Sequence, residues 1–274
     1  MTYPQATWRV IIHPAASGAM NMAIDEAIAM HVAQEHSPPT LRFYAWDPPC
    51  LSLGYSQRAS DADFDRIHER GWHIVRRITG GRAILHTDEV TYSVALRPDD
   101  PRGAGSIVES YRRLSAGLLA GFERLGASVG SERADSAARR FKGPVCFEMP
   151  SDYEITAYGR KLVGSAQTRR DGMLLQHGAL PLTGDVSRIV DALSFPDEEA
   201  RETARRRTLE RAITLQEAVG VRQSMARTVG QLMAGFAEAL NLILEEGQLS
   251  EAEQAAAEDL YHTKYTTEEW LHHR

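Results

Sequence analysis

The sequence predicts a mixed α/β chain, because strand-like and helix-like segments are both present. Around residues 152–177, three extended runs are separated by Tyr158-Gly159 and by Asp171-Gly172. Glycine accepts positive φ angles, so these pairs predict tight turns in a three-stranded meander. Over residues 106–126, apolar residues recur instead at helical spacing, at Ile107, Tyr111, Leu114, Leu118, Phe122 and Leu125. This second pattern predicts an amphipathic helix that packs on a core.

The other elements follow from the same two patterns and from the Pro and Gly residues that separate them. Before the meander, strands are expected at residues 7–12, 41–46, 51–54, 73–77 and 90–96, and helices at 21–34 and 61–70. After the meander, helical segments are expected at residues 186–193, 198–211, 221–241 and 250–261. Asp25 and Glu26 are expected near the start of the first helix, where the helix dipole favours acids. The polar stretch 128–142 is expected to be a loop.

Composition narrows the class of protein. The 274 residues allow one large or two small domains, and 43% hydrophobic with 25% charged residues is typical of a soluble globular chain. A net charge of -6 does not favour nucleic-acid binding. No signal peptide and no apolar run of about 20 residues is evident, so a membrane partner is not expected. Cys, His and Asp do not cluster at metal-ligand spacing, so no metal site is predicted.

The chain has two cysteines, Cys50 and Cys146. This number does not suggest a disulfide framework and fits a reducing, cytoplasmic location. Cys50 lies among Pro and Leu and is expected to be a small buried hydrophobe. Cys146 stands just before the meander, and Lys161 lies near the start of its second strand. A nearby ammonium favours the thiolate, so the two residues suggest an activated nucleophile, against the alternatives of an inert thiol and a surface lysine.

Strand alternation predicts which side chains share a face with the lysine. Lys161, Val163 and Ser165 are expected on one face of their strand, and Leu162, Gly164 and Ala166 on the other.

A glycine loop forms the second candidate site. Thr79-Gly80-Gly81 lies between two expected strands and is flanked by arginines. Backbone without side chains can approach a ligand closely, and guanidinium groups suit a phosphate, an adenylate or a carbonyl oxygen. His86 could equally be a hydrogen-bonded structural residue. An apolar acyl chain would need a hydrophobic slot. The candidate substrate-binding residues are Arg76, Arg77, Gly80, Gly81, Arg82, Ala83, Ile84, Leu85, His86, Val163, Gly164, Ser165, Ala166 and His177.

Several motifs occur in an order that resembles a known family. They are N-M-A-x-D-E at 21–26, R-R-x-T-G-G-R-A-x-L-H at 76–86, T-Y-S-V at 91–94, G-R-K-L-V-G-S-A-Q at 159–167, Q-H-G at 176–178 and K-Y-x-x-x-E-W at 264–270. Over almost its whole length the chain resembles the lipoate–protein ligase/octanoyltransferase family. The resemblance implies the biotin/lipoate protein ligase fold, a mostly antiparallel β-sheet flanked by helices. It also implies one catalytic domain over residues 1–246 and a short C-terminal helical segment over 247–274.

Within the family, one motif points to a reaction. C-F-x-x-P-S-x-Y-E at 146–154 resembles the octanoyltransferase that modifies the glycine cleavage H protein. The resemblance implies that Cys146 carries an acyl thioester and that Lys161 assists. It also implies that octanoyl-acyl carrier protein is the donor, and that the glycine cleavage H protein or another lipoyl domain is the acceptor. The ATP-dependent ligases typically show a third glycine where this chain has Arg82, which favours the transferase and no cofactor.

Three alternatives stay open at this point. An ATP-dependent lipoate–protein ligase would need Lys161 and Mg-ATP but not Cys146. An amidotransferase would move the acyl group between lipoyl domains. A non-catalytic acyl-binding protein would keep the pocket and tolerate loss of both residues.

Overall fold

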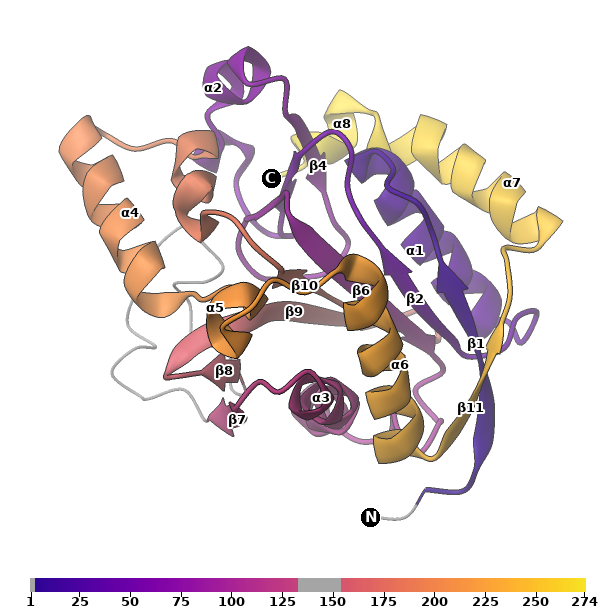
Figure 1. Cartoon of the computed structure of the whole chain (residues 1–274). Coiled ribbons are helices and arrows are strands. Elements are labelled where there is room, and N and C mark those ends of the chain that lie inside the picture. Colours follow the sequence, from indigo (N-terminus) through magenta and orange to yellow (C-terminus); the bar gives the residue numbers. More distant parts are fainter. Residues whose placement is uncertain (1–2, 133–153) are drawn as a thin grey trace.

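The computed structural model of the protein describes residues 3–132 and 154–274, and it is built on one large β-sheet (Figure 1). The strand order in this eight-stranded sheet is β11-β1-β2-β6-β10-β9-β8-β7. The strands are β1 (Ala6–Ile12), β2 (Thr40–Tyr44), β6 (Glu89–Leu96), β7 (Val129–Glu132), β8 (Glu154–Ala157), β9 (Arg160–Arg170), β10 (Met173–Pro181) and β11 (Leu242–Glu246). Strand β1 pairs in parallel with β11 and β2, and all other neighbours are antiparallel. The predicted mostly antiparallel sheet, with its meander, is confirmed.

A smaller sheet and eight α-helices complete the described part of the chain. The small sheet has the order β4-β3-β5, with β3 (Cys50–Leu53), β4 (His73–Arg76) and β5 (Ile84–His86). The α-helices are α1 (Gly18–Ala33), α2 (Phe64–Glu69), α3 (Ile107–Arg124), α4 (Glu198–Arg211), α5 (Leu215–Val219), α6 (Met225–Leu240), α7 (Glu251–Leu260) and α8 (Glu268–Leu271). Short 3₁₀ turns span Ala59–Asp61 and Val186–Ala192, and a π-helical turn spans Tyr261–Tyr265.

Helices α3 and α6 cover one face of the large sheet, and α1 covers the opposite face with α7 outside it (Figure 1). The close crossing of α3 and α6 depends on glycine. A Cβ atom on Gly235 of α6 would lie 2.3 Å from the backbone nitrogen of Gly121 on α3. Phe122 and Phe236 both lie in the core on this side of the sheet, where the ring centroid of Tyr92 lies 6.0 Å from that of Phe236.

The first helix starts earlier than the sequence suggested. Ser17 caps α1 by accepting a hydrogen bond from the backbone N–H of Met20. Asp25 and Glu26 therefore lie in the middle of the helix, buried, and the explanation of these acids by the helix dipole is wrong. Both acids are held instead by ion pairs with partners from other elements.

Two further differences concern short elements. Residues 129–132 of the expected loop form the edge strand β7, which pairs with β8. The strands β5 and β11 and the short helix α5 were not predicted.

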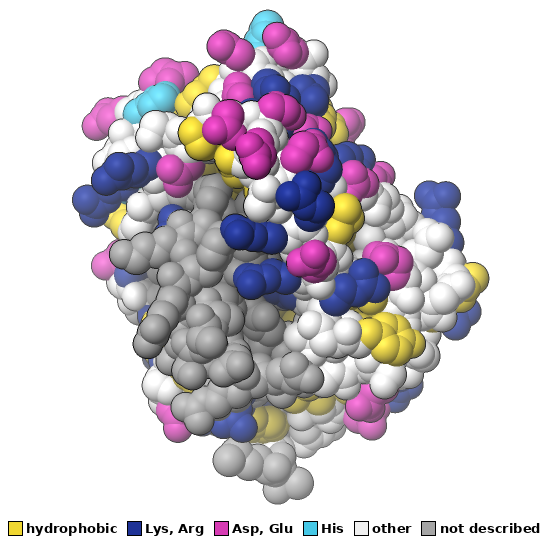
Figure 2. Space-filling model, turned by 90° about the vertical axis from the view of Figure 1, so that its left-hand side faces the viewer, with side chains coloured by type: hydrophobic (Ala, Val, Ile, Leu, Met, Phe, Trp, Pro, Cys, Tyr) yellow, Lys and Arg dark blue, Asp and Glu magenta, His cyan; other side chains and the backbone are white. Residues whose placement is uncertain are grey.

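The charge-dense segment at 198–211 forms helix α4, as expected. Figure 2 shows Lys and Arg side chains intermixed with Asp and Glu on the side of the molecule that carries this helix.

The C-terminal segment packs along α1 and reaches the small sheet (Figure 1). Glu26 of α1 accepts hydrogen bonds from Lys264 Nζ at 2.7 Å and from the Tyr265 hydroxyl at 2.6 Å. At the far end, the indole N–H of Trp270 donates to the backbone oxygen of Arg76 at 2.9 Å. Among the described residues, no helix has the length and apolar character needed to cross a membrane.

Candidate active site

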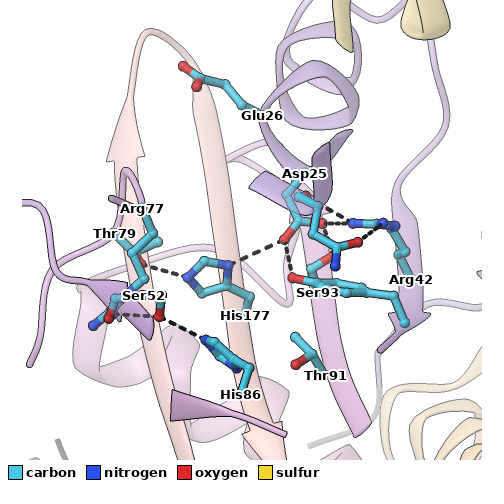
Figure 3. A network of polar contacts seen from close by, with 12 residues as sticks. Asp25, Glu26, Arg42, Ser52, Arg77, Thr79, His86, Thr91, Ser93 and His177 are labelled. Carbon is cyan, nitrogen blue, oxygen red and sulfur yellow. Dashed lines mark hydrogen bonds and ion pairs between the residues drawn. The ribbon is translucent and has the colours of Figure 1, made fainter. Parts of the chain in front are cut away.

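A polar row crosses the middle of the large sheet on the face covered by α1. Strand pairing sets Arg42 of β2 beside Ser93 of β6, Ser93 beside His177 of β10, and His177 beside Ala166 of β9. Paired residues point to the same face, so these four side chains form a line across four strands. The carboxylate of Asp25 reaches down from α1 onto this line (Figure 3).

Asp25 is a buried carboxylate with several donors. It accepts hydrogen bonds from Arg42 at 2.7 Å, from the Ser93 hydroxyl at 2.8 Å and from the Tyr44 hydroxyl at 2.7 Å. Burial would raise the pKa of Asp25, but Arg42, His177 and Tyr44 outweigh burial and lower the pKa to about 2. Asp25 is therefore ionised at neutral pH, and Arg42 supplies its countercharge.

His177 connects this row to the glycine loop. Its Nδ1 lies 3.3 Å from an Asp25 carboxylate oxygen, and its Nε2 lies 2.6 Å from the hydroxyl oxygen of Thr79 (Figure 3). Burial lowers the pKa of His177 below its ordinary value, although Asp25 opposes this effect. The imidazole is therefore neutral at pH 7.

A narrow cavity lies between this face and the small sheet. The row next to the polar one consists of Tyr44, Thr91, Ala179 and Gly164, whose short members leave space above the large sheet. The cavity has about 340 Å³ including its opening. Its lining residues are Met22, Tyr44, Trp46, Ser52, Arg77, Ile84, His86, Thr91, Gly164, Ser165, Ala166, His177, Gly178 and Ala179. Such a mostly apolar slot with a few polar groups is typical of a small-ligand site.

His86 forms one wall of the cavity and is held from several sides. Its ring stacks on Trp46 with the ring centroids 3.7 Å apart. Its Nδ1 lies 2.6 Å from Glu89, and its Nε2 lies 2.8 Å from the Ser52 hydroxyl. The two interpretations of His86 are therefore compatible, because its ring is held by hydrogen bonds and also lines the cavity.

The two adjacent arginines have different environments. Arg77 lines the cavity and donates hydrogen bonds to the backbone oxygens of Ser52, Gly80 and Arg82. Arg76 points away, and its guanidinium donates to the backbone oxygens of Gly54, Tyr55, Gln57 and Leu271. Arg76 therefore fastens the C-terminal segment to the small sheet.

The other predicted substrate-binding residues also divide into those that line the cavity and those that do not. Ile84, His86, Gly164, Ser165, Ala166 and His177 line the cavity with Arg77. Gly80 and Gly81 are exposed in the loop beside it, and Arg82 is half-buried. Ala83 packs in the core under the small sheet with Leu85 against it, and Val163 lies in the core on the α3 and α6 side.

Lys161 lies just beyond an irregularity in β9. The pairing of β8 with β9 shifts by one residue, because Ile155 faces Val163 whereas Thr156 faces Lys161. Such a β-bulge interrupts side-chain alternation. The expectation that Lys161 shares a face with Val163 and Ser165 is therefore wrong. Lys161 pairs with Thr156, so its side chain lies on the face opposite that of the buried Ile155.

The two cysteines differ in what the structure says of them. Cys146 lies outside the described residues. Cys50 is fully buried, and burial raises the pKa of its thiol far above the ordinary value. This environment agrees with the expectation that Cys50 is a packing residue.

Sequence reasoning missed the residues that approach the cavity from other elements, namely Met22, Tyr44, Trp46, Ser52 and Thr91. It also missed the buried pair of Asp25 and Arg42. One signal was available for the pair, because each charge lies within a helix or strand rich in apolar residues, and buried charges need partners.

Comparison with known proteins identifies the family. The model of the lipoyl protein ligase A/B catalytic domain matches residues 17–237. The octanoyltransferase LipM of Kyrpidia tusciae is 45% identical over 269 residues, which cover 96% of this chain and 98% of the relative. The octanoyltransferase LipM of Bacillus subtilis is 38% identical over 274 residues, which cover 98% and 99%.

Solved structures give the same fold. A bipartite lipoate protein ligase from Thermoplasma acidophilum, studied with its E2 lipoyl domain, is 26% identical with a TM-score of 0.80, covering 97% of this chain and 96% of that chain. A lipoate-protein ligase A bound with ATP is 26% identical with a TM-score of 0.78, covering 98% of each chain. The higher identity to transferases than to these ligases decides between the two enzyme classes. The chain belongs to the lipoyl protein ligase A/B catalytic domain family, and within that family it is an octanoyltransferase.

Proposed function

We propose that this octanoyltransferase moves the octanoyl group from octanoyl-acyl carrier protein to a lysine of the glycine cleavage H protein, in lipoate biosynthesis. Cys146 attacks the carrier thioester, its sulfur forms a new bond to the acyl carbon, and the carrier leaves as a thiol. The amine of the acceptor lysine then attacks this second thioester, the amide bond forms, and the Cys146 sulfur leaves and regains a proton. We propose the cytoplasm as the location, since a free thiol nucleophile needs a reducing compartment.

The step needs no ATP. One thioester replaces another in the first transfer, and conversion of a thioester to an amide is downhill in the second. We therefore propose that the enzyme uses no cofactor. A ligase would instead activate free octanoate or lipoate with Mg-ATP.

The position of Lys161 is the observation that carries the proposal. The register places its side chain on the face of Thr156, which is the face that carries Gly164 and Ala166 of the cavity. Its backbone is also held on the other edge, where the Ile213 N–H donates to the Lys161 oxygen at 3.0 Å. An ammonium on this face can favour the Cys146 thiolate, polarise the thioester carbonyl and relay a proton from the attacking amine.

The first experiment tests the thioester. The protein is incubated with octanoyl carrier protein without ATP, and its intact mass is measured before and after hydroxylamine. We expect one octanoyl group, labile to hydroxylamine, that is absent from Cys146→Ala. A wild-type transfer rate in Cys146→Ala would refute the thioester route, and transfer from free octanoate with Mg-ATP in that variant would establish the ligase.

The second experiment tests Lys161. Lys161→Ala and Lys161→Arg should both lose about 100-fold or more in turnover, the range for a general acid–base group, because arginine keeps the charge but stays protonated. Alkylation of Cys146 by iodoacetamide, followed against pH, should show a higher thiol pKa in Lys161→Ala. Unchanged turnover in both variants would remove Lys161 from the mechanism. An octanoylated lipoyl domain offered as donor in place of the carrier protein tests the amidotransferase alternative.

A further inference from the structure

The buried acid Asp25 has a position that the transfer chemistry does not explain. Its side chain is 1% exposed and lies on α1, whereas the proposed reacting groups belong to other elements. A buried carboxylate and guanidinium are costly to desolvate, so the pair with Arg42 adds little to stability by itself. The contact from Asp25 to His177 leads directly to the cavity.

The protons in this chain of contacts can be assigned from the groups present. Asp25 is ionised and can only accept, so the Nδ1 of His177 carries the hydrogen. The imidazole is neutral, and its Nε2 is then an acceptor. The hydrogen bond at 2.6 Å is therefore donated by the Thr79 hydroxyl to Nε2.

Thr79 begins the glycine loop, which has few other attachments. The Tyr55 N–H donates to the Thr79 oxygen at 2.9 Å, and Arg77 donates to the oxygens of Gly80 and Arg82 at 2.9 and 2.7 Å. Arg77 directly follows β4, and Tyr55 lies just after β3. These bonds therefore tie the loop to the small sheet. Among the hydrogen bonds of the described residues, the bond from Thr79 to His177 is the one that ties this loop to the large sheet.

We propose that Asp25 is a positioning residue, which through His177 and Thr79 holds the glycine loop across the gap between the two sheets in its ligand-binding form. The cavity lies between those sheets, so this bond, together with the contact from His86 to Glu89, sets its width. A loop held in advance costs less ordering entropy when the acyl donor binds. Asp25 thus acts on binding of the donor and does not touch the reacting atoms.

The proposal predicts a specific pattern among variants at position 79. Thr79→Val has nearly the same shape but no hydroxyl, whereas Thr79→Ser keeps the hydroxyl. One lost hydrogen bond of about 1 kcal/mol corresponds to roughly a fivefold change in an equilibrium. We expect KM for octanoyl carrier protein to rise about fivefold in Thr79→Val with kcat within about twofold, and Thr79→Ser to restore it. Thr263→Val is the matched control, since Thr263 is exposed and its hydroxyl donates only within its own segment, to the Asp259 oxygen.

Two measurements without substrate keep the test independent of the proposed donor. In ¹⁵N-histidine-labelled protein, the His177 resonances, assigned by their loss in His177→Gln, should show a protonated Nδ1 and an unprotonated Nε2. Asp25→Asn should change this signature. Amide exchange at Gly80 and Gly81 should be faster in Thr79→Val and in Asp25→Asn than in Thr79→Ser.

The outcomes separate clearly. Unchanged exchange and unchanged KM in Thr79→Val would overturn the proposal, and so would a protonated Nε2 in the wild-type protein. If Asp25→Asn fails to fold because Arg42 loses its partner, the position 79 variants and the wild-type ¹⁵N spectrum still decide. If the wild-type protein shows no turnover with octanoyl carrier protein, the proposed donor is wrong, while exchange and tautomer still test Asp25.

Discussion

The hydroxyl of Tyr265 offers a direct measure of how firmly the C-terminal segment is attached to the rest of the chain. It donates to Glu26 at 2.6 Å, and the two residues are 5% and 4% exposed. Burial and the neighbouring Glu26 raise the pKa of Tyr265 well above its ordinary value, so the hydroxyl keeps its proton at neutral pH. Tyr265→Phe removes this one bond and keeps the ring.

The magnitude follows from what remains on Glu26. A hydrogen bond to a charged group contributes about 1.5–3 kcal/mol. The same carboxylate oxygen still accepts from Lys264 at 2.7 Å, and the other oxygen accepts from Arg170 at 3.0 Å. Glu26 therefore keeps other partners. We expect Tyr265→Phe to lower the free energy of unfolding by an amount at the low end of this range, about 1.5 kcal/mol.

The assay is urea unfolding at pH 7, followed by fluorescence and by circular dichroism. With a slope near 3 kcal/mol per molar urea, the midpoint should fall by about 0.5 M. Tyr261→Phe is the control, since the Tyr261 hydroxyl has no hydrogen-bond partner within the residues that the structure describes. Equal midpoints in the two variants would refute the reasoning. We further propose that residues 247–274 unfold together with residues 1–246, and a separate early transition in wild-type protein would contradict this.

Three more predictions follow from single contacts. In Gly178→Ala the new Cβ would lie 2.6 Å from the Tyr92 ring, so thermal unfolding should show a loss of about 1–3 kcal/mol, and an unchanged melting temperature would contradict it. Cys50, buried and with a raised pKa, should resist iodoacetamide in a native variant without the other cysteine and react only after unfolding, as mass spectrometry can show. Burial would raise the pKa of Glu253, but hydrogen bonds such as that from Arg9 at 2.5 Å lower it. The ionised Glu253 then stabilises the folded chain above about pH 4.3, and this stabilisation is lost as the pH falls further. Glu253→Gln should therefore cost more stability at pH 7 than at pH 3 in urea titrations.

The sequence predicts best those features that depend on neighbours along the chain. The turns at Gly159 and Gly172 both have positive φ angles, as their position between strands indicated. The helix expected over residues 106–126 also forms, as α3, and its start at Ser106 carries a capping box with Glu109. These features are local, and local chemistry decides them.

The polar row could not be predicted in the same way. It requires that Arg42, Ser93 and His177 fall in register on three strands that are far apart in sequence. Periodicity shows which face a residue takes within one strand but not which residue stands opposite. The three-residue strand β5 is likewise too short to produce a pattern, and it forms because β3 lies beside it.

The β-bulge before Val163 has a consequence for how this strand tolerates change. One extra residue shifts the alternation of side chains. The side chains beyond it therefore point to the opposite face from the one that regular alternation would give them. The segment that lines the cavity and the segment that carries Lys161 can therefore use opposite parity within one strand. Removing Leu162 would leave a regular ladder in which Lys161 still pairs with Thr156. The same residues paired without the bulge would instead turn the lysine toward the apolar layer under α3 and α6, where an ammonium has no water. At this place the pairing register, and not only the identity of the residues, sets the face that Lys161 takes.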